Sequence, residues 1–227
     1  QAEDGIRDLV RSRGLGDVYK RQLYDFIVPT NDPSTVHLVI ADVTGKGVPA
    51  ALYMAVSRTL LHSYACDGYS PGEALRRVND FIRQDAASPL LLSAFYAVLD
   101  ADIGRLTYAN AGHNAPIHLR AATGEMELLQ SRGLLLGAFA TFLPDEQTCS
   151  LEPGDFVVFF TDGITEARNG DGGFFDDEGL EAVVRSQSWS SAEELVSAIV
   201  SAVDTFAAGA AQADDFTVVV LQRLPPA

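Results

Sequence analysis

Runs of β-forming residues follow one another along much of this chain, joined by turns too short to cross over a sheet. Residues 23–28 (LYDFIV) and 35–43 (TVHLVIADV) flank the turn residues PTNDPS, which predicts a hairpin. Residues 91–102, 104–112 and 115–122 are separated by IG and GHN, which predicts an antiparallel meander. Because such short connections cannot join parallel strands, the sheets are predicted to be largely antiparallel.

Two pairs of predicted helices interrupt these strands. The first pair covers residues 50–65 and 70–86, and the second covers 178–185 and 192–206. The helix that begins after the N-cap residue Ser70 has one apolar face. That face comprises Leu75, Val78, Phe81 and Ile82. Strand blocks interrupted by helix pairs indicate an α+β fold in which helices pack on the faces of sheets.

The first 22 residues do not share this pattern. They begin without methionine and lack a convincing apolar period. They resemble the translated adapter read-through found at the broken ends of assembled reading frames; the alternative is a genuine mixed-charge helix or linker. Residues 1–22 are therefore predicted to be an artefact or a disordered tail, and residues 23–227 a single domain.

Composition limits the partners and the compartment. The 227 residues include 31 Asp and Glu against 16 Lys and Arg, for a formal net charge of −15. Nucleic acids and anionic membranes require a basic face, so neither is predicted as a partner. No run approaches the ~20 apolar residues of a membrane span. The two cysteines, Cys66 and Cys149, have no metal-binding spacing, and the chain is predicted to be cytoplasmic.

Three predicted strands carry acids at their ends. Asp42 ends the run LVIAD, Asp162 follows VVFFT, and Asp214 and Asp215 precede FTVVVL. An acid at the edge of an apolar core is costly unless a partner such as a cation offsets its burial. If these ends converge, they form an all-oxygen site for Mg²⁺ or Mn²⁺. Asp is also common in turns and caps, so each position taken singly is equally consistent with a local role.

Four stretches, in order along the chain, resemble the motifs of the SpoIIE-type branch of bacterial metal-dependent protein phosphatases (2C type). They are IADVTGKGVPAALYMA, TYANAGHNAPIHLR, LEPGDFVVFFTDGITEARNGDGGFF and ADDFTVVVL. The resemblance extends from about Leu23 to Arg223. It implies an αββα sandwich: two mostly antiparallel sheets flanked by helices, with metals in a cleft at one sheet edge. It also implies hydrolysis of phosphoserine or phosphothreonine by water that two divalent cations, Mn²⁺ or Mg²⁺, activate.

The resemblance gives roles to individual residues of these motifs. Asp42 would bridge the two metals, with the carbonyl of Val43 as a further ligand. Asp162 and Asp214 would complete the acidic cluster, with Asp215 as an outer or alternate ligand. The predicted catalytic residues are therefore Asp42, Asp162 and Asp214.

The chain departs from the family pattern at one point. The family carries Gly-Gly-Asp just before the strand that corresponds to LYDF, where this chain has Lys20, Arg21 and Gln22. Asp25 lies three residues further on and would face the other side of an extended strand. The missing carboxylate predicts weakened metal binding. It also leaves an alternative open: a degenerate phosphatase fold that binds a regulator without catalysis.

Further candidates for contact with the substrate or support of the metal ligands are Lys46, Gly45, His113, Asn114 and Gly163. Lys46 either holds a phosphate at the start of a helix or is a solvated turn lysine. His113 either donates a proton to the leaving serine or, with Asn114, fixes a turn between two strands. The glycines let the backbone come close to a ligand.

The expected partners come from family analogy. The implied substrate is a phosphorylated anti-sigma-factor antagonist, a small regulatory protein. An upstream sensor domain and a second copy of the chain, giving a homodimer, are further expected partners. The helices of residues 50–86 would transmit their effect to the metal site.

Overall fold

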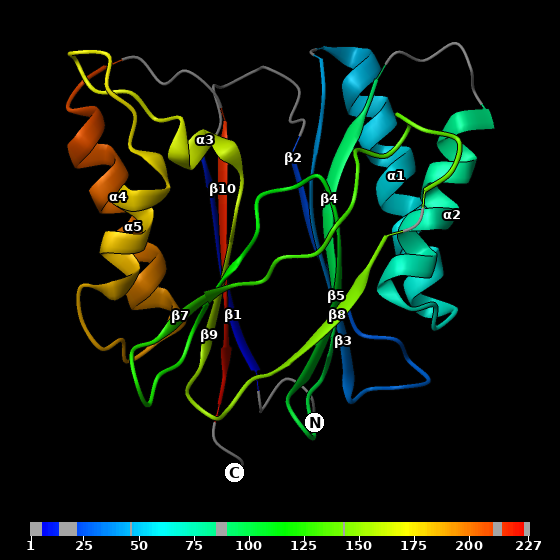
Figure 1. Ribbon diagram of the computed structural model, residues 1–227, viewed down its shortest axis with the longest axis horizontal. Coiled ribbons are helices and arrows are strands. Elements are labelled where there is room, and N and C mark those ends of the chain that lie inside the picture. The colour runs from blue at the N-terminus through cyan, green and yellow to red at the C-terminus, as the bar shows by residue number, and fades with distance from the viewer. Residues whose placement is uncertain are drawn as a thin grey trace. The chain divides into compact units, whose positions relative to one another are not determined.

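The computed structural model describes residues 6–13, 22–45, 47–84, 90–142, 144–210 and 215–224 (Figure 1). The chain divides into two compact units. Unit 1 is built mainly from Tyr19–Ala115 and Gln130–Leu151, and unit 2 from Glu3–Val18, Pro116–Leu129 and Glu152–Ala227.

Unit 1 is a five-stranded antiparallel sheet in the order β2-β3-β4-β5-β8, with two helices on one face. The strands are β2 (Gln22–Ile27), β3 (Thr35–Val43), β4 (Leu92–Asp100), β5 (Arg105–Ala111) and β8 (Glu146–Ser150). The helices are α1 (Val48–Cys66) and α2 (Pro71–Gln84). The predicted hairpin and first helix pair are confirmed, with ends that differ by one or two residues.

The alternation of side chains along β3 determines which residues face the helices. Ala41 and Val43 are buried in one apolar cluster with Leu75, Val78 and Ile82 of α2. Asp42, between them, therefore points to the opposite face of the sheet.

The prediction that Phe81 belongs to the buried apolar face of α2 is wrong. Phe81 is 45% exposed. A single residue step turns an α-helix by about 100°, so Phe81 lies a quarter turn away from the buried stripe that includes Ile82.

Helix α2 has charges that suit its polarity. Glu73 is in the first turn and Arg83 in the last, as the helix dipole favours. The backbone N–H of Glu73 donates to the Ser70 hydroxyl over 3.5 Å, so the predicted N-cap contact is present but long. The hydrogen bond from Arg76 lowers the pKa of Glu73 to about 2.

Unit 2 contains a second five-stranded antiparallel sheet, in the order β1-β10-β9-β6-β7. Its strands are β1 (Ile6–Arg13), β6 (Ile117–Leu119), β7 (Met126–Leu128), β9 (Phe156–Phe160) and β10 (Phe216–Arg223). Helices α4 (Asp176–Arg185) and α5 (Ala192–Ala207) pack on one face, and the one-turn helix α3 (Asp162–Thr165) follows β9. The predicted α+β class, with two antiparallel sheets and flanking helices, is confirmed.

The predicted meander is wrong in its third strand. β4 and β5 pair, but β6 pairs with β7 and β9 in the sheet of unit 2. The side chain of Asn110 closes the chain on itself after β5: its Nδ2 donates to the His113 carbonyl over 2.8 Å, and its Oδ1 accepts the His113 N–H over 2.7 Å. The chain therefore leaves the first sheet at this loop instead of turning back.

The segment before residue 22 contributes one strand. β1 pairs with β10 from Ile6 opposite Arg223 to Arg13 opposite Phe216. Residues 1–5 and 14–21 lie outside the described residues. The artefactual origin of residues 1–22 and the single domain from residue 23 stay predictions. Within the described ranges, no helix combines the length and apolar character needed to cross a bilayer.

Candidate metal centre

In unit 1, the predicted ligand Asp42 belongs to a row of polar residues across three strands. It is the penultimate residue of β3, opposite Gln22 of β2 and Ser93 of β4. Directly opposed residues of antiparallel strands project from the same face. Since Ala41 and Val43 project into the helix-covered core, this polar row lies on the other face of the sheet.

The register between β2 and β3 shows which residue lies beside position 22. Gln22, where the resemblance predicts an Asp, stands directly across from Asp42 in the pairing of β2 with β3. Asp25 faces elsewhere: its Oδ2 lies 3.1 Å from Nε of Arg58 in α1. Asp25 therefore does not take the place of the missing acid.

His113 is tied to the same row. Its Nδ1 lies 3.0 Å from the hydroxyl of Ser93, which in turn lies 3.4 Å from the carbonyl oxygen of Asp42. Its backbone is held by Asn110, as described above. Sequence reasoning missed Ser93, because its role depends on the register between β3 and β4.

The other candidates of unit 1 flank this row. The side chain of Val43 is buried in the core at the end of β3. Gly45 has φ +91°, and a Cβ there would come within 2.8 Å of Cδ2 of Leu90. Asn114 follows His113 and is half-buried. Lys46 lies outside the described residues.

In unit 2, two acids lie at one end of the sheet. Asp162 is the first residue of α3 and is separated from β9 by Thr161 alone, and Asp215 directly precedes β10. The two strands are antiparallel, so the end of one lies beside the start of the other. Thr161 and Thr217 fix this junction: the Thr161 N–H donates to the Thr217 carbonyl over 3.0 Å, and the Thr217 N–H donates to the Thr161 hydroxyl over 2.9 Å.

Gly163 brings the two segments into direct contact. A Cβ at this position would overlap the backbone carbonyl of Asp215, so only glycine allows the approach. Asp215 itself is 8% exposed. Asp214, the remaining predicted ligand, lies outside the described residues.

The residues that can be described fit a hard cation. Oδ1 of Asp162 is buried and accepts no hydrogen bond from the part of the chain that the structure describes. A buried carboxylate oxygen in that state is costly, and a divalent cation offsets this cost. The described residues include no cluster of three or more His, Cys, Asp or Glu that could hold a metal. Whether Asp42, Asp162 and Asp215 share one site stays a prediction.

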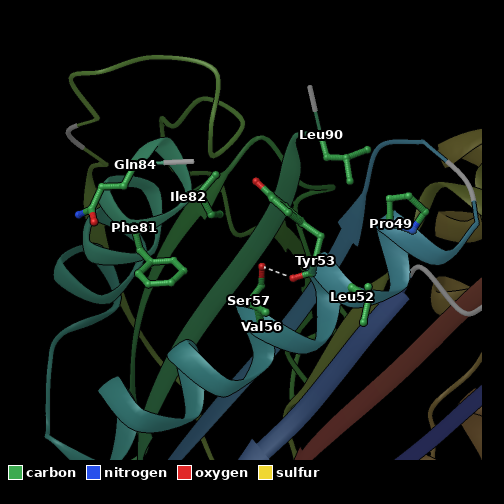
Figure 2. A pocket seen from close by; sticks show the side chains of 9 residues that line it. All are labelled: Pro49, Leu52, Tyr53, Val56, Ser57, Phe81, Ile82, Gln84 and Leu90. Carbon is green, nitrogen blue, oxygen red and sulfur yellow. Dashed lines mark hydrogen bonds between the residues drawn. The ribbon is translucent and has the colours of Figure 1, made fainter. Parts of the chain in front are cut away.

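A separate pocket of about 650 Å³ opens between α1 and α2 in unit 1 (Figure 2). Figure 2 shows that apolar side chains form most of its wall. The lining residues are Pro49, Leu52, Tyr53, Val56, Ser57, Phe81, Ile82, Gln84 and Leu90. The pocket continues an exposed apolar stripe of α1, which consists of Val48, Leu52 and Val56.

Comparison with known proteins decides the family. The model of the SpoIIE family (Stage II sporulation protein E) matches residues 32–224. The chain belongs to the SpoIIE family. Phosphoserine phosphatase RsbU of Bacillus subtilis (strain 168) is 31% identical over 204 residues, which make up 90% of this chain and 60% of RsbU. This SpoIIE-family chain therefore spans less than two thirds of that relative.

Solved structures support the fold. The SiaA-PP2C domain of Pseudomonas aeruginosa superposes with a TM-score of 0.82 at 18% identity, covering 96% of this chain and 86% of the domain. RsbX, solved in complex with magnesium, superposes with a TM-score of 0.71 at 17% identity, covering 97% of this chain and 96% of RsbX. The SpoIIE-family chain thus has the PP2C-like α+β fold.

Proposed function

We propose that this SpoIIE-family chain is a metal-dependent protein serine/threonine phosphatase. It would hydrolyse phosphoserine or phosphothreonine on a regulatory protein. The observation that carries the proposal is the buried Oδ1 of Asp162 at the junction of β9 and β10, beside Asp215. Homology to phosphoserine phosphatase RsbU supports the same reaction class.

The proposed cofactors are two Mn²⁺ or Mg²⁺ ions. Asp42, the Val43 carbonyl, Asp162, Asp214 and Asp215 would hold them, and the magnesium complex of the structurally similar RsbX supports this choice. When bound, such ions activate water and neutralise the phosphoryl oxygens.

The chain's own residues would orient the substrate and exchange protons. Nδ1 of His113 is engaged with Ser93, so exchange of a proton with the leaving serine would use Nε2. The bonds between Asn110 and the His113 backbone support the turn-fixing role as well. Both roles are compatible, because one uses the backbone and the other the ring.

The proposed substrate is a phosphorylated anti-sigma-factor antagonist, by analogy with the family. We place the activity in the cytoplasm, in keeping with the absence of a disulfide between Cys66 and Cys149. An upstream sensor and a second copy of the chain are proposed to act through α1 and α2. The exposed apolar stripe of α1 supports a contact with another protein on this face.

A second candidate function is a binding module that docks a regulator without turnover. The observation that favours it is Gln22 opposite Asp42, because an amide there provides no charge for a cation.

One experiment separates the two. The starting chain is compared with the variant Lys20→Gly, Arg21→Gly, Gln22→Asp for Mn²⁺-dependent hydrolysis of p-nitrophenyl phosphate and of a phosphoserine protein. Asp162→Asn in both backgrounds is the control. Activity that appears in the triple variant and disappears with Asp162→Asn supports the phosphatase. Mn²⁺ binding without release of phosphate from either substrate supports the binding module.

A further inference from the structure

Asn79 is a polar side chain in the middle of the apolar face of α2. It is 0% exposed, and its helix neighbours Leu75, Val78 and Ile82 belong to the core of unit 1. A buried amide is tolerated only where its donor and acceptor are both satisfied. Its partners therefore indicate what it does.

Both ends of the amide bind the backbone of one loop. Oδ1 of Asn79 accepts the N–H of Gly137 over 2.9 Å, and Nδ2 donates to the carbonyl of Phe139 over 3.2 Å. Arg83, one turn further along α2, donates to the carbonyl of Gly137 over 3.2 Å. Helix α2 thus holds the loop by hydrogen bonds from its side chains to the backbone of Gly137 and Phe139.

The loop fits closely against the helices at Gly137. This residue has φ +89°, and a Cβ there would lie 3.2 Å from Cγ2 of Ile82 and 3.4 Å from Oη of Tyr53. The backbone of Gly137 therefore packs so closely against the helices that little space is left for a side chain at this position. Such a close fit allows Asn79 to fix the position of the loop.

The residue before Gly137, Leu136, is hydrogen-bonded to the strand that carries Ser93. Leu136 and Leu92 exchange two backbone hydrogen bonds, with N···O distances of 2.9 and 3.2 Å. Leu92 is the first residue of β4, and Ser93 follows it in the row opposite Asp42. Asn79, Gly137, Leu136 and Leu92 therefore form a continuous chain of bonds from α2 to the polar row.

We propose that Asn79 is a positioning residue: by holding Gly137 and Phe139 it fixes the start of β4, and so the alignment of Ser93 with Asp42 and His113. The effect on catalysis rests on the proposed phosphatase function. The effect on the strand end does not, and it is measured separately.

The test uses Asn79→Leu, which keeps the branched shape of the side chain, suits the apolar cluster and removes both hydrogen bonds. Val78→Ala is the matched control, because it weakens the same core without removing a hydrogen bond from Asn79 to the loop. Residue-resolved amide exchange by NMR in metal-free protein reports on Leu92, Leu136 and Gly137. We expect about tenfold faster exchange of these amides in Asn79→Leu relative to the global unfolding limit, and no such change in Val78→Ala.

A second variant covers a failure of Asn79→Leu to fold. Asn79→Ala removes the same two bonds with a smaller, uncharged side chain that cannot clash with the core. We expect an increase of about tenfold at the same amides, because both bonds are lost.

Activity is read in the background Lys20→Gly, Arg21→Gly, Gln22→Asp. There we expect Asn79→Leu to raise the Mn²⁺ concentration for half-maximal hydrolysis about tenfold, in the range seen when residues behind metal ligands are lost, with Val78→Ala unchanged. Equal exchange at Leu92 in Asn79→Leu and the parent overturns the positioning role, as does an equal increase in Val78→Ala. Faster exchange without turnover in any variant supports the positioning role while the proposed phosphatase fails.

Discussion

Both units consist of a five-stranded antiparallel sheet with helices on one face, but their helices meet the solvent differently. In unit 2, the described residues of α3, α4 and α5 include no exposed large apolar side chain, and the exposed positions of α5 include Glu193 and Asp204. In unit 1, α1 exposes Val48, Leu52 and Val56. The same architecture therefore carries one polar outer face and one apolar outer face.

The difference follows from the sequences of the helices. All exposed positions of α5 are polar: Glu193, Ser201, Asp204 and Thr205. The apolar residues of this helix are therefore all used inside unit 2. α1 has apolar residues on more sides than its buried stripe, which includes Ala50, Met54 and Leu61 of the core. The surplus apolar surface is what the proposed contact with a second copy would cover.

The largest effect is expected for substitutions of the predicted metal ligands, which test whether both units are needed for the same reaction although their surfaces differ. Both tests start from the triple variant Lys20→Gly, Arg21→Gly, Gln22→Asp. In it, Asp42→Asn in unit 1 and Asp162→Asn in unit 2 are each expected to lower Mn²⁺-dependent hydrolysis at least about 100-fold. The reason is that loss of a metal ligand exceeds the 10- to 100-fold effect of losing a residue that orients a ligand. Asp25→Asn, which lies against Arg58, is the control and should change the rate only a few-fold. A loss confined to one unit would contradict a shared site.

The next effect concerns the histidine that unit 1 buries beside Tyr96. Burial lowers the pKa of His37 from 6.5 to about 4, against the opposing attraction of Asp32. The unfolded chain binds this proton as the pH falls through 6.5, whereas the folded chain does so only near 4. Stability from neutral His37 is thus complete above pH 6.5, and about 2–3 kcal/mol is lost between pH 6.5 and 4.

Urea unfolding at pH 7.5 and pH 4.5 measures this loss. His37→Gln should flatten the difference between the two pH values, and His62→Gln, at an exposed position of α1, should leave it unchanged. An undiminished difference in His37→Gln would assign the pH dependence to other groups.

A smaller effect separates the outer faces directly. Leu52 is 62% exposed, so Leu52→Asp should change the free energy of unfolding by less than about 0.5 kcal/mol. If the apolar stripe of α1 joins two copies, the same change should weaken self-association at least about tenfold. Sedimentation velocity over a concentration series measures this, with Leu128→Asp on β7 of unit 2 as the control. Unchanged association and unchanged activity in Leu52→Asp would remove the proposed role of this face.

The smallest effect concerns how the helices begin. The Ser191 hydroxyl accepts the Glu194 N–H over 3.2 Å at the start of α5, whereas the N-cap residue of α1 is Gly47, which provides no side-chain cap. Ser191→Ala should lower the free energy of unfolding by about 1 kcal/mol. Ser201→Ala, at an exposed position within α5, should have little effect or stabilise the helix slightly. A loss equal in the two variants would show that the cap adds nothing.

Strong periodic elements were predictable from the sequence, and the connections between them were not. The strands at 35–43 and 156–160 and helix α2 have buried apolar patterns that leave one interpretation. The departure of β6 to the other sheet depends on its pairing with β7 and β9, which no local pattern encodes. β1 was missed because its residues have no apolar period.

The site divides in the same way. Asp42 and Asp162 could be placed at strand ends because apolar runs precede them. Ser93 required the pairing of β3 with β4, which sequence alone does not provide. Asn79 did leave a signal: it is a polar residue at a position where the spacing from Leu75 and Ile82 requires burial.

The pairing of β1 along β10 has a practical consequence for anyone who shortens this protein. Cutting the chain at residue 22, where its family-like part begins, would remove β1 from one edge of Phe216–Arg223 and leave β9 as its neighbour on the other edge. An uncovered strand of that length recruits other strands and favours aggregation. Oligomers of a trimmed protein would then arise from an open sheet edge, and they would say nothing about the apolar stripe of α1.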